Sequence, residues 1–140
     1  MSVVAKNYQA ARAGGEVRLF KSHREGVVDG GQRRDFIYVN DVVDVILWCL
    51  DQAPSHGLFN VGTGRATSFR ELIEALYEAV GQPPRIVYVP MPEALRDRYQ
   101  YLTQASLEAL RAAGYDRQFT PVGRAVADYV GYLSKDDRYR

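Results

Sequence analysis

Apolar residues recur at the spacing of an amphipathic helix in three stretches, residues 1–13, 69–80 and 122–133. A nearly continuous apolar run at 42–50 predicts a buried helix, and residues 103–113 predict a further helix. Short apolar runs predict strands at 17–20, 36–39, 58–61 and 86–89. Helices and strands thus share the chain, which indicates an α/β protein, but this order cannot build a complete doubly wound sheet.

The stretch 34–45 joins the second predicted strand to the buried helix, and the rest of the chain is organised around it. Asn40 or Asp41 is expected to cap the first turn of that helix, because these side chains accept hydrogen bonds from free backbone N–H groups. Arg34 and Asp35 are expected at the rim of whatever surface the strand lines.

Polar residues and glycines predict where the other helices begin and end. Ser68 and Glu71 have the spacing of a capping box, so a helix is expected to begin just after Ser68. Thr120 is expected to cap the last helix, with Pro121 at its first position, where a missing N–H costs nothing. A turn is expected at 52–57. Three predicted helices are each expected to end at a glycine, at Gly14-Gly15, Gly81 and Gly114.

Composition removes several classes of function. The 140 residues form one domain or part of a larger one, and 46% hydrophobic residues are enough for a core. A net charge of +1 gives no electrostatic case for binding nucleic acid or a membrane surface. Two histidines and one cysteine do not predict a zinc site, and Cys49 is expected to be a small buried hydrophobe rather than a reactive thiol. No apolar run reaches the roughly 20 residues of a membrane span, and a cytoplasmic protein is expected.

The first predicted helix has no capping residue before it. This suggests that Met1 is an internal methionine of a longer protein, and a native start is the alternative. No signal peptide is apparent at this end of the sequence.

Two stretches gather candidate binding groups. The polar loop 21–33 is rich in basic residues and glycines, and it is either a solvated loop or a lid that meets an anionic ligand such as a diphosphate. Residues 96–101 concentrate arginine and tyrosine, and the alternative there is a surface helix with ordinary salt bridges.

A family resemblance adds to this picture. Arg34-Asp35-Phe36 together with Asn60-x-Gly62-x-Gly64 resembles the extended short-chain dehydrogenases that act on nucleotide sugars. The motif Arg98-Tyr99-Gln100-Tyr101-x-Thr103-x-Ala105, followed by Leu110-Arg111-x-Ala113-Gly114-Tyr115, is similar to the ADP-L-glycero-D-manno-heptose 6-epimerase family. The resemblance implies an incomplete Rossmann-type fold, in which residues 1–140 are the C-terminal, substrate-binding part of an epimerase and the N-terminal cofactor-binding part is absent.

The resemblance also implies an activity. Members of the family invert C6 of an ADP-heptose, a lipopolysaccharide precursor, by transient oxidation and re-reduction with bound NADP, and a tyrosine and a lysine act as acid and base. No Tyr-x-x-x-Lys occurs in this sequence, and no catalytic or cofactor-binding residue is assigned in it. The chain alone is therefore expected to be inactive, and the full-length enzyme to be a homo-oligomer acting on an ADP-sugar. The alternatives are another NAD(P)-dependent nucleotide-sugar epimerase or dehydratase, and a non-catalytic nucleotide-sugar-binding module.

The site residues follow from the resemblance. Arg34 matches the family arginine at the substrate diphosphate, and Tyr99 matches a substrate-binding tyrosine. A substrate-contacting segment corresponds to Phe20, Lys21, Ser22 and His23. On the residues alone, Arg34 could instead form an ion pair with Asp35 or Asp41, and Tyr99 could be a half-buried surface aromatic.

Overall fold

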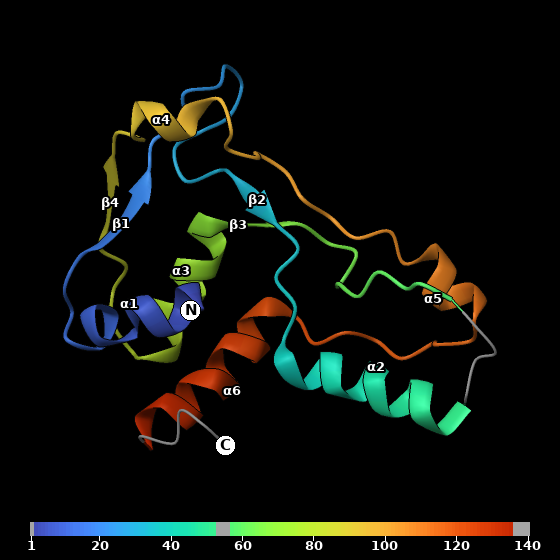
Figure 1. The fold of residues 1–140 in the computed structure, drawn as a ribbon. Helices are drawn as coiled ribbons and strands as arrows, with labels where there is room; N and C mark the ends of the chain where they lie inside the picture. The colour runs from blue at the N-terminus through green and yellow to red at the C-terminus, as the bar shows by residue number, and fades with distance from the viewer. Residues whose placement is uncertain (1, 53–56, 136–140) are drawn as a thin grey trace.

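The computed structural model describes residues 2–52 and 57–135 as a mixed α/β fold (Figure 1). Its elements in chain order are α1 (Val3–Arg12), β1 (Val17–Phe20), β2 (Arg33–Arg34), α2 (Val39–Gln52), β3 (Thr67–Ser68), α3 (Phe69–Ala79), β4 (Ile86–Val89), α4 (Glu93–Arg96), α5 (Glu108–Ala112) and α6 (Val122–Ser134). None of the helices in these two ranges is long and apolar enough to cross a membrane.

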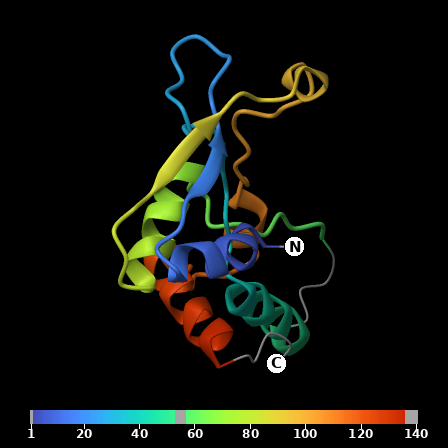
Figure 2. The ribbon, with the colours of Figure 1, turned by 90° about the vertical axis from the view of Figure 1, so that its left-hand side faces the viewer.

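The larger core lies between a parallel strand pair and three helices. β1 and β4 run side by side (Figure 2), with Val17 opposite Ile86 and Phe20 opposite Val89. Helices α1, α3 and α6 pack on one another, α1 and α3 also pack on β1, and each helix gives its apolar face to the core. The most deeply buried side chains of this core include Tyr8, Ala11, Val17, Ile73, Leu76 and Tyr77.

A smaller core joins α2 to α5 on the side of the molecule away from β1 and β4 (Figure 1). Val45 of α2, Leu110 of α5 and Tyr115 form its buried centre. Trp48 packs edge-on against Tyr115, with their ring centroids 5.4 Å apart. Cys49 packs against this cluster as a hydrophobe, but it is only partly buried rather than buried as expected.

The short strand β2 lies between the two cores and is hydrogen-bonded to two segments distant in sequence, β3 and residues 101–103. Arg33 and Arg34 pair antiparallel with Ser68 and Thr67 of β3. On the other side of β2, the Arg33 amide donates to the carbonyl of Tyr101 at 2.8 Å, and the Thr103 amide donates to the carbonyl of Arg33 at 3.2 Å. Segments that carry separate sequence motifs therefore meet at β2.

Several elements predicted from the hydrophobic pattern are confirmed. The helices expected at 1–13, 69–80 and 122–133 and the strands expected at 17–20 and 86–89 are present. The capping box is complete, because the Glu71 amide donates to Ser68 Oγ at 3.1 Å and the Ser68 amide donates to Glu71 Oε2 at 2.7 Å.

The strands expected at 36–39 and 58–61 are wrong. Residues 35–38 and 57–61 are not part of any strand, and Val39 already begins α2. Their composition suits a strand, but a strand also needs a hydrogen-bonded neighbour, and the described residues place none beside them. The turn expected at 52–57 falls mostly on residues 53–56, which lie outside the described part of the chain.

The expectations for the start and burial of α2 are also wrong. Asn40 and Asp41 lie inside the first turn of α2, and the Asp41 carboxylate accepts hydrogen bonds from the Thr120 amide at 2.8 Å and the Thr120 hydroxyl at 2.7 Å. Only Asp41 and Val45 of this helix are buried. Its exposed apolar residues are Val39, Val43, Ile46, Leu47 and Leu50. The described chain therefore leaves most of this apolar helix uncovered.

Three further helices begin or end at other residues than expected. The helix expected at 103–113 is restricted to α5, because the backbone N–H groups of Thr103 and Ala105 bond to β2 and to Asp35 instead. The surface helix considered for 96–101 is limited to α4, which ends at Arg96. Helix α6 begins after Pro121 rather than after Thr120, whose hydroxyl binds Asp41.

Candidate functional site

The candidate site lies at the carboxyl ends of the parallel strands β1 and β4. The chain leaves β1 at Phe20, and the Lys21 amide extends the pairing by donating to the Val89 carbonyl at 2.8 Å. The Phe20 ring meets the Tyr99 ring edge-on, with centroids 6.1 Å apart. Ligands of open α/β sheets commonly bind outside the carboxyl ends of parallel strands, so this placement favours a binding role.

Arg34 lies against two aromatic rings at this end of the sheet. Its guanidinium carbon is 5.3 Å from the Tyr99 centroid and 5.8 Å from the Phe69 centroid. One of its N–H groups donates to the neighbouring carbonyl of Arg33 at 2.8 Å. Such cation–π contacts orient a guanidinium without neutralising its charge, and its remaining N–H donors can bind an anion.

The ion pairs considered for Arg34 are absent among residues 2–52 and 57–135. Asp35 bonds to backbone and hydroxyl donors, and Asp41 bonds to Thr120. Burial raises the pKa of Tyr99, while the Arg34 guanidinium acts in the opposite direction. Tyr99 therefore stays a neutral phenol, able to donate or accept a hydrogen bond.

The Asp35 carboxylate joins two other segments to the site. It accepts from the Thr63 amide at 2.7 Å, the Thr63 hydroxyl at 2.6 Å, the Gly64 amide at 2.9 Å and the Ala105 amide at 3.1 Å. Burial alone would raise the pKa of Asp35, but these hydrogen bonds from Thr63, Ala105 and Gly64 lower it below its ordinary value. Asp35 is thus a structural anchor beside Arg34.

The two glycines of the Gly62-x-Gly64 turn are required by this anchor. A Cβ at Gly62 would lie 2.6 Å from the Ala105 Cβ and 2.6 Å from Asp35 Oδ2, and Gly64 has a φ of +72°. Both positions therefore disfavour any other residue. The Arg34-Asp35 motif, the glycine turn and the segment ending at Ala105 form one structural unit.

Tyr101 is the central residue of a second cluster beside Tyr99. Its hydroxyl accepts from the His23 amide at 3.0 Å and lies 2.9 Å from His23 Nδ1 and 3.4 Å from Ser22 Oγ. The Tyr101 and Tyr99 rings meet edge-on at 6.0 Å, and the Arg24 guanidinium carbon lies 5.2 Å from the Tyr101 centroid. Burial would raise the pKa of Tyr101, but the polar groups of Ser22, His23, Gln32 and Arg24 around its oxygen lower it.

The structure brings five of the six predicted site residues together. Arg34, Tyr99 and Phe20 share one cluster, and Ser22 and His23 join it through Tyr101. The sixth, Lys21, has an exposed side chain, and its contacts here are made by its backbone.

Sequence reasoning missed Tyr101 and Arg24 as members of this cluster. The Tyr99-x-Tyr101 spacing was a usable signal for Tyr101, because alternate residues of an extended segment point to the same side and can line one site. Nothing in the sequence singled out Arg24 among the charges of its loop.

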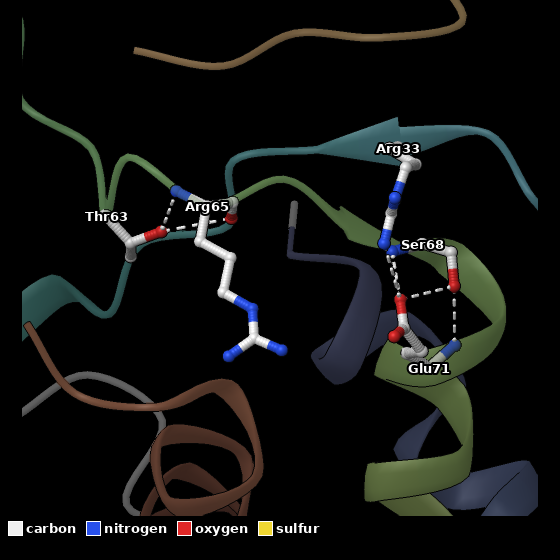
Figure 3. A network of polar contacts seen from close by, with 5 residues as sticks. All are labelled: Arg33, Thr63, Arg65, Ser68 and Glu71. Carbon is white, nitrogen blue, oxygen red and sulfur yellow. Dashed lines mark hydrogen bonds and ion pairs between the residues drawn. The ribbon is translucent and has the colours of Figure 1, made fainter. Parts of the chain in front are cut away.

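A polar network lies on β3 and the start of α3, around Glu71 (Figure 3). Arg33 pairs with Glu71 at 3.8 Å, and Glu71 also completes the capping box with Ser68. Arg65 extends from the turn that follows Thr63, and no hydrogen bond or ion pair joins its guanidinium to the other residues drawn in Figure 3. Arg33 is thus partly neutralised, whereas Arg34 forms no ion pair with the described residues.

The structure also has a hollow that is lined mainly by apolar residues. It has a volume of about 660 Å³ between α1, the segment 36–39 and α6. Its polar rim is Tyr38, whose hydroxyl contacts Asp128 and accepts from Asn40 Nδ2 at 3.2 Å. Burial and the Asp128 carboxylate raise the pKa of Tyr38. In the described part of the chain, no group of three histidine, cysteine or acidic side chains could hold a metal ion.

Comparison with known proteins gives the site its context. Residues 1–62 match the model of the NAD dependent epimerase/dehydratase family. An ADP-L-glycero-D-manno-heptose-6-epimerase of Nitratidesulfovibrio vulgaris is 42% identical over 139 residues, which are 99% of this chain and 43% of the relative. The enzyme of the same name from Fusobacterium nucleatum is 40% identical and covers 99% of this chain and 44% of the relative. The chain is similar to heptose 6-epimerases.

Solved structures agree with this resemblance. The Helicobacter pylori ADP-L-glycero-D-manno-heptose-6-epimerase superposes with a TM-score of 0.71 at 25% identity, covering 95% of this chain and 38% of that one. A UDP-glucose 4-epimerase from Thermus thermophilus gives 0.73 at 27% identity, covering 94% and 40%. The expected family resemblance and the incomplete Rossmann-type α/β fold are confirmed. The chain spans less than half the length of the curated relatives it matches.

Proposed function

We propose that residues 1–140 are the C-terminal, substrate-binding part of a nucleotide-sugar epimerase that inverts C6 of an ADP-glycero-manno-heptose for lipopolysaccharide synthesis. The observation that carries this proposal is Arg34, which lies against Tyr99 and Phe69 at the carboxyl ends of β1 and β4 and forms no ion pair with the described residues. The 40–43% identity to heptose 6-epimerases over nearly the whole chain supports the choice of sugar.

In this proposal the chain binds and orients the substrate. Arg34 offers the planar fork of donors that matches two phosphate oxygens at once. Tyr99 offers a ring face for stacking and a hydroxyl for a ribose or sugar oxygen. Phe20, Ser22 and His23 border the same surface, and Lys21 adds an exposed cation beside them.

The residues of this chain do not fit the pyrophosphate of NADP. The Gly62-x-Gly64 turn is filled by Asp35 and Ala105, so no phosphate can approach its backbone. We therefore assign no redox step to these residues. NADP, the nicotinamide cofactor of the proposed enzyme, would be held mainly by the additional length that the relatives possess, and the whole enzyme would be a cytoplasmic homo-oligomer.

The proposal is tested by calorimetric titration of the chain with ADP-glycero-manno-heptose, UDP-glucose and NADP. We expect binding of the ADP-sugar, weaker binding of UDP-glucose, and loss of ADP-sugar affinity in Arg34→Ala. Arg85→Ala is a matched control, because Arg85 pairs with Glu16 at the opposite end of β4. Equal affinity for the two sugar nucleotides would favour a different epimerase or dehydratase, such as the UDP-sugar enzymes among the structural relatives.

A non-catalytic nucleotide-sugar-binding module is the second candidate. The observation that favours it is the absence of a Tyr-x-x-x-Lys motif from the 140 residues. A fusion of this chain to the unmatched part of the Fusobacterium nucleatum relative would distinguish the epimerase from the non-catalytic module. Inversion at C6 by the joined protein, followed by NMR of the heptose, supports the enzyme, and a stably folded but inactive product that still binds the ADP-sugar supports the module.

A further inference from the structure

The phenol of Tyr101 fixes the turn that follows β1. Only 9% of Tyr101 is exposed, and its hydroxyl accepts the backbone N–H of His23 at 3.0 Å. The His23 ring also contacts this oxygen, because Nδ1 lies 2.9 Å from it. A side chain 78 residues further along the sequence thus holds both the backbone and the ring of His23.

The hydrogen bonds of His23 assign its tautomer. Nε2 lies 3.1 Å from the carbonyl oxygen of Arg96, which can only accept, so Nε2 carries the hydrogen. In the neutral ring Nδ1 is then the acceptor, and it receives the Tyr101 hydroxyl hydrogen. His23 is therefore held at three atoms, between Tyr101 and the end of α4.

This anchoring determines where Arg24 lies. The Ser22 hydroxyl accepts the Arg24 amide at 3.1 Å and donates to the Arg24 carbonyl at 3.0 Å, which closes a tight turn around His23. The Ser22 amide in turn donates to the Asp29 carboxylate at 2.7 Å. The Arg24 guanidinium then lies over the Tyr101 ring at 5.2 Å, as Arg34 lies over Tyr99 at 5.3 Å.

Both guanidiniums keep their charge. Of the ion pairs between residues 2–52 and 57–135, none includes Arg24 or Arg34. The rings that carry them are neighbours, with the Tyr99 and Tyr101 centroids 6.0 Å apart. Two unneutralised arginines on adjacent tyrosines suit a ligand that carries more than one negative charge.

We propose that Tyr101 is a positioning residue, which holds the Ser22–Arg24 turn so that Arg24 serves as the second guanidinium, beside Arg34, for the diphosphate of the ligand. This inference rests on the proposed function. It adds Arg24 to the binding residues and gives the polar loop after β1 a role in binding an anion.

The experiment titrates the 140-residue chain with ADP and with adenosine by calorimetry. Arg24→Ala is expected to weaken ADP binding about tenfold and to leave adenosine binding unchanged, since adenosine has no phosphate. The dependence of ADP affinity on salt is expected to fall as well. Arg12→Ala is the matched control, because Arg12 lies over the Tyr8 ring at 6.0 Å, outside the site.

Tyr101→Phe keeps the ring and removes the bonds to His23. We expect it to weaken ADP binding several-fold, and the double variant Tyr101→Phe/Arg24→Ala to bind no more weakly than Arg24→Ala alone. Such non-additive losses would show that Tyr101 acts through Arg24, whereas a general loss of stability would weaken binding further in the double variant. Tyr115→Phe is the control, because Tyr115 is buried in the smaller core and its hydroxyl makes no hydrogen bond to the described residues.

The outcomes distinguish this inference from the proposed function. ADP binding that needs Arg34 but not Arg24 contradicts the inference and leaves the proposed function standing. Additive losses in the double variant remove Tyr101 from its positioning role. A native chain that does not bind ADP contradicts the proposed function, and the inference fails with it.

Discussion

Asp35 accepts two hydrogen bonds from Thr63 on one carboxylate oxygen, from the amide at 2.7 Å and from the hydroxyl at 2.6 Å. The other oxygen receives the amides of Gly64 and Ala105. One side chain therefore satisfies donors on two segments that are distant from it in sequence, and this arrangement places β2, with Arg34, relative to the rest of the site.

Asp35→Asn should destabilise the fold. An asparagine amide offers one oxygen and one NH₂ group, so the NH₂ group would face the Gly64 and Ala105 donors or the Thr63 donors. We expect a loss of about 2 kcal/mol in the free energy of unfolding, measured by urea denaturation. Asp44→Asn, at an exposed position of α2, should cost little. Equal stability of the two variants would show that Asp35 is not an anchor.

The stabilisation by Asp35 should depend on pH in a defined direction. Its pKa is lowered in the folded chain, so the contribution is complete above the unfolded value near 3.8 and is lost as pH falls through the lower folded value. The difference in melting temperature between the native chain and Asp35→Asn should therefore be constant near neutral pH and shrink below about pH 4. A difference that grows on acidification would contradict this assignment.

Arg34→Lys should weaken binding of the ADP-sugar nearly as much as Arg34→Ala. Lysine keeps the positive charge but loses the bidentate fork and the contacts with Tyr99 and Phe69, and the loss should be about tenfold. The melting temperature should change little, because Arg34 forms no ion pair among the described residues. Lost stability with unchanged affinity would instead make Arg34 a structural residue.

The uncovered face of α2 should cause the chain to self-associate. Leu50 is 74% exposed and Ile46 54%, so these side chains place apolar surface in water. Sedimentation should show concentration-dependent association of the native chain, and Ile46→Lys/Leu50→Lys should reduce it. Leu95→Lys, at an isolated exposed leucine of α4, is the control. A native chain that stays monomeric at high concentration would contradict this prediction.

NADP should not bind detectably to this chain. The glycine turn at 62–64 is closed by Asp35 and Ala105, and the sequence has no glycine-rich strand-to-helix turn for a pyrophosphate. Calorimetry with NADP would measure this directly. Binding at micromolar concentration would contradict the proposal that this chain binds the substrate while the cofactor is held by the additional length of its relatives.

Helix α3 could be predicted from the sequence because its cause is local. The apolar face of α3 and its capping box need only residues within one or two turns, and they were predicted correctly. The strand expected at 36–39 depended on a neighbouring strand, which local pattern cannot supply. The helix expected from Thr103 was shortened because donors at Thr103 and Ala105 are used by β2 and Asp35.

In the candidate site, too, some residues could be predicted from the sequence and others could not. Arg34 and Tyr99 could be proposed because their motifs carry a family resemblance, and the structure places them in contact. Tyr101 was missed because its importance lies in bonds to His23, across 78 residues of sequence. The Tyr99-x-Tyr101 spacing indicates that both rings can face the same side, but it does not reveal that His23 is the partner of Tyr101.

The pairing of β1 with β4 has a consequence for the synthesis of the chain. The two strands are parallel, and β2, α2, β3 and α3 all lie between them in sequence. During translation β1 leaves the ribosome before β4, so the pairing of these two strands cannot form until α3 and β4 have followed. Contacts of such long sequence separation form slowly. The carboxyl ends of the two strands, which carry Phe20 and the turn to Arg24, therefore cannot reach their final arrangement before β4 has been synthesised.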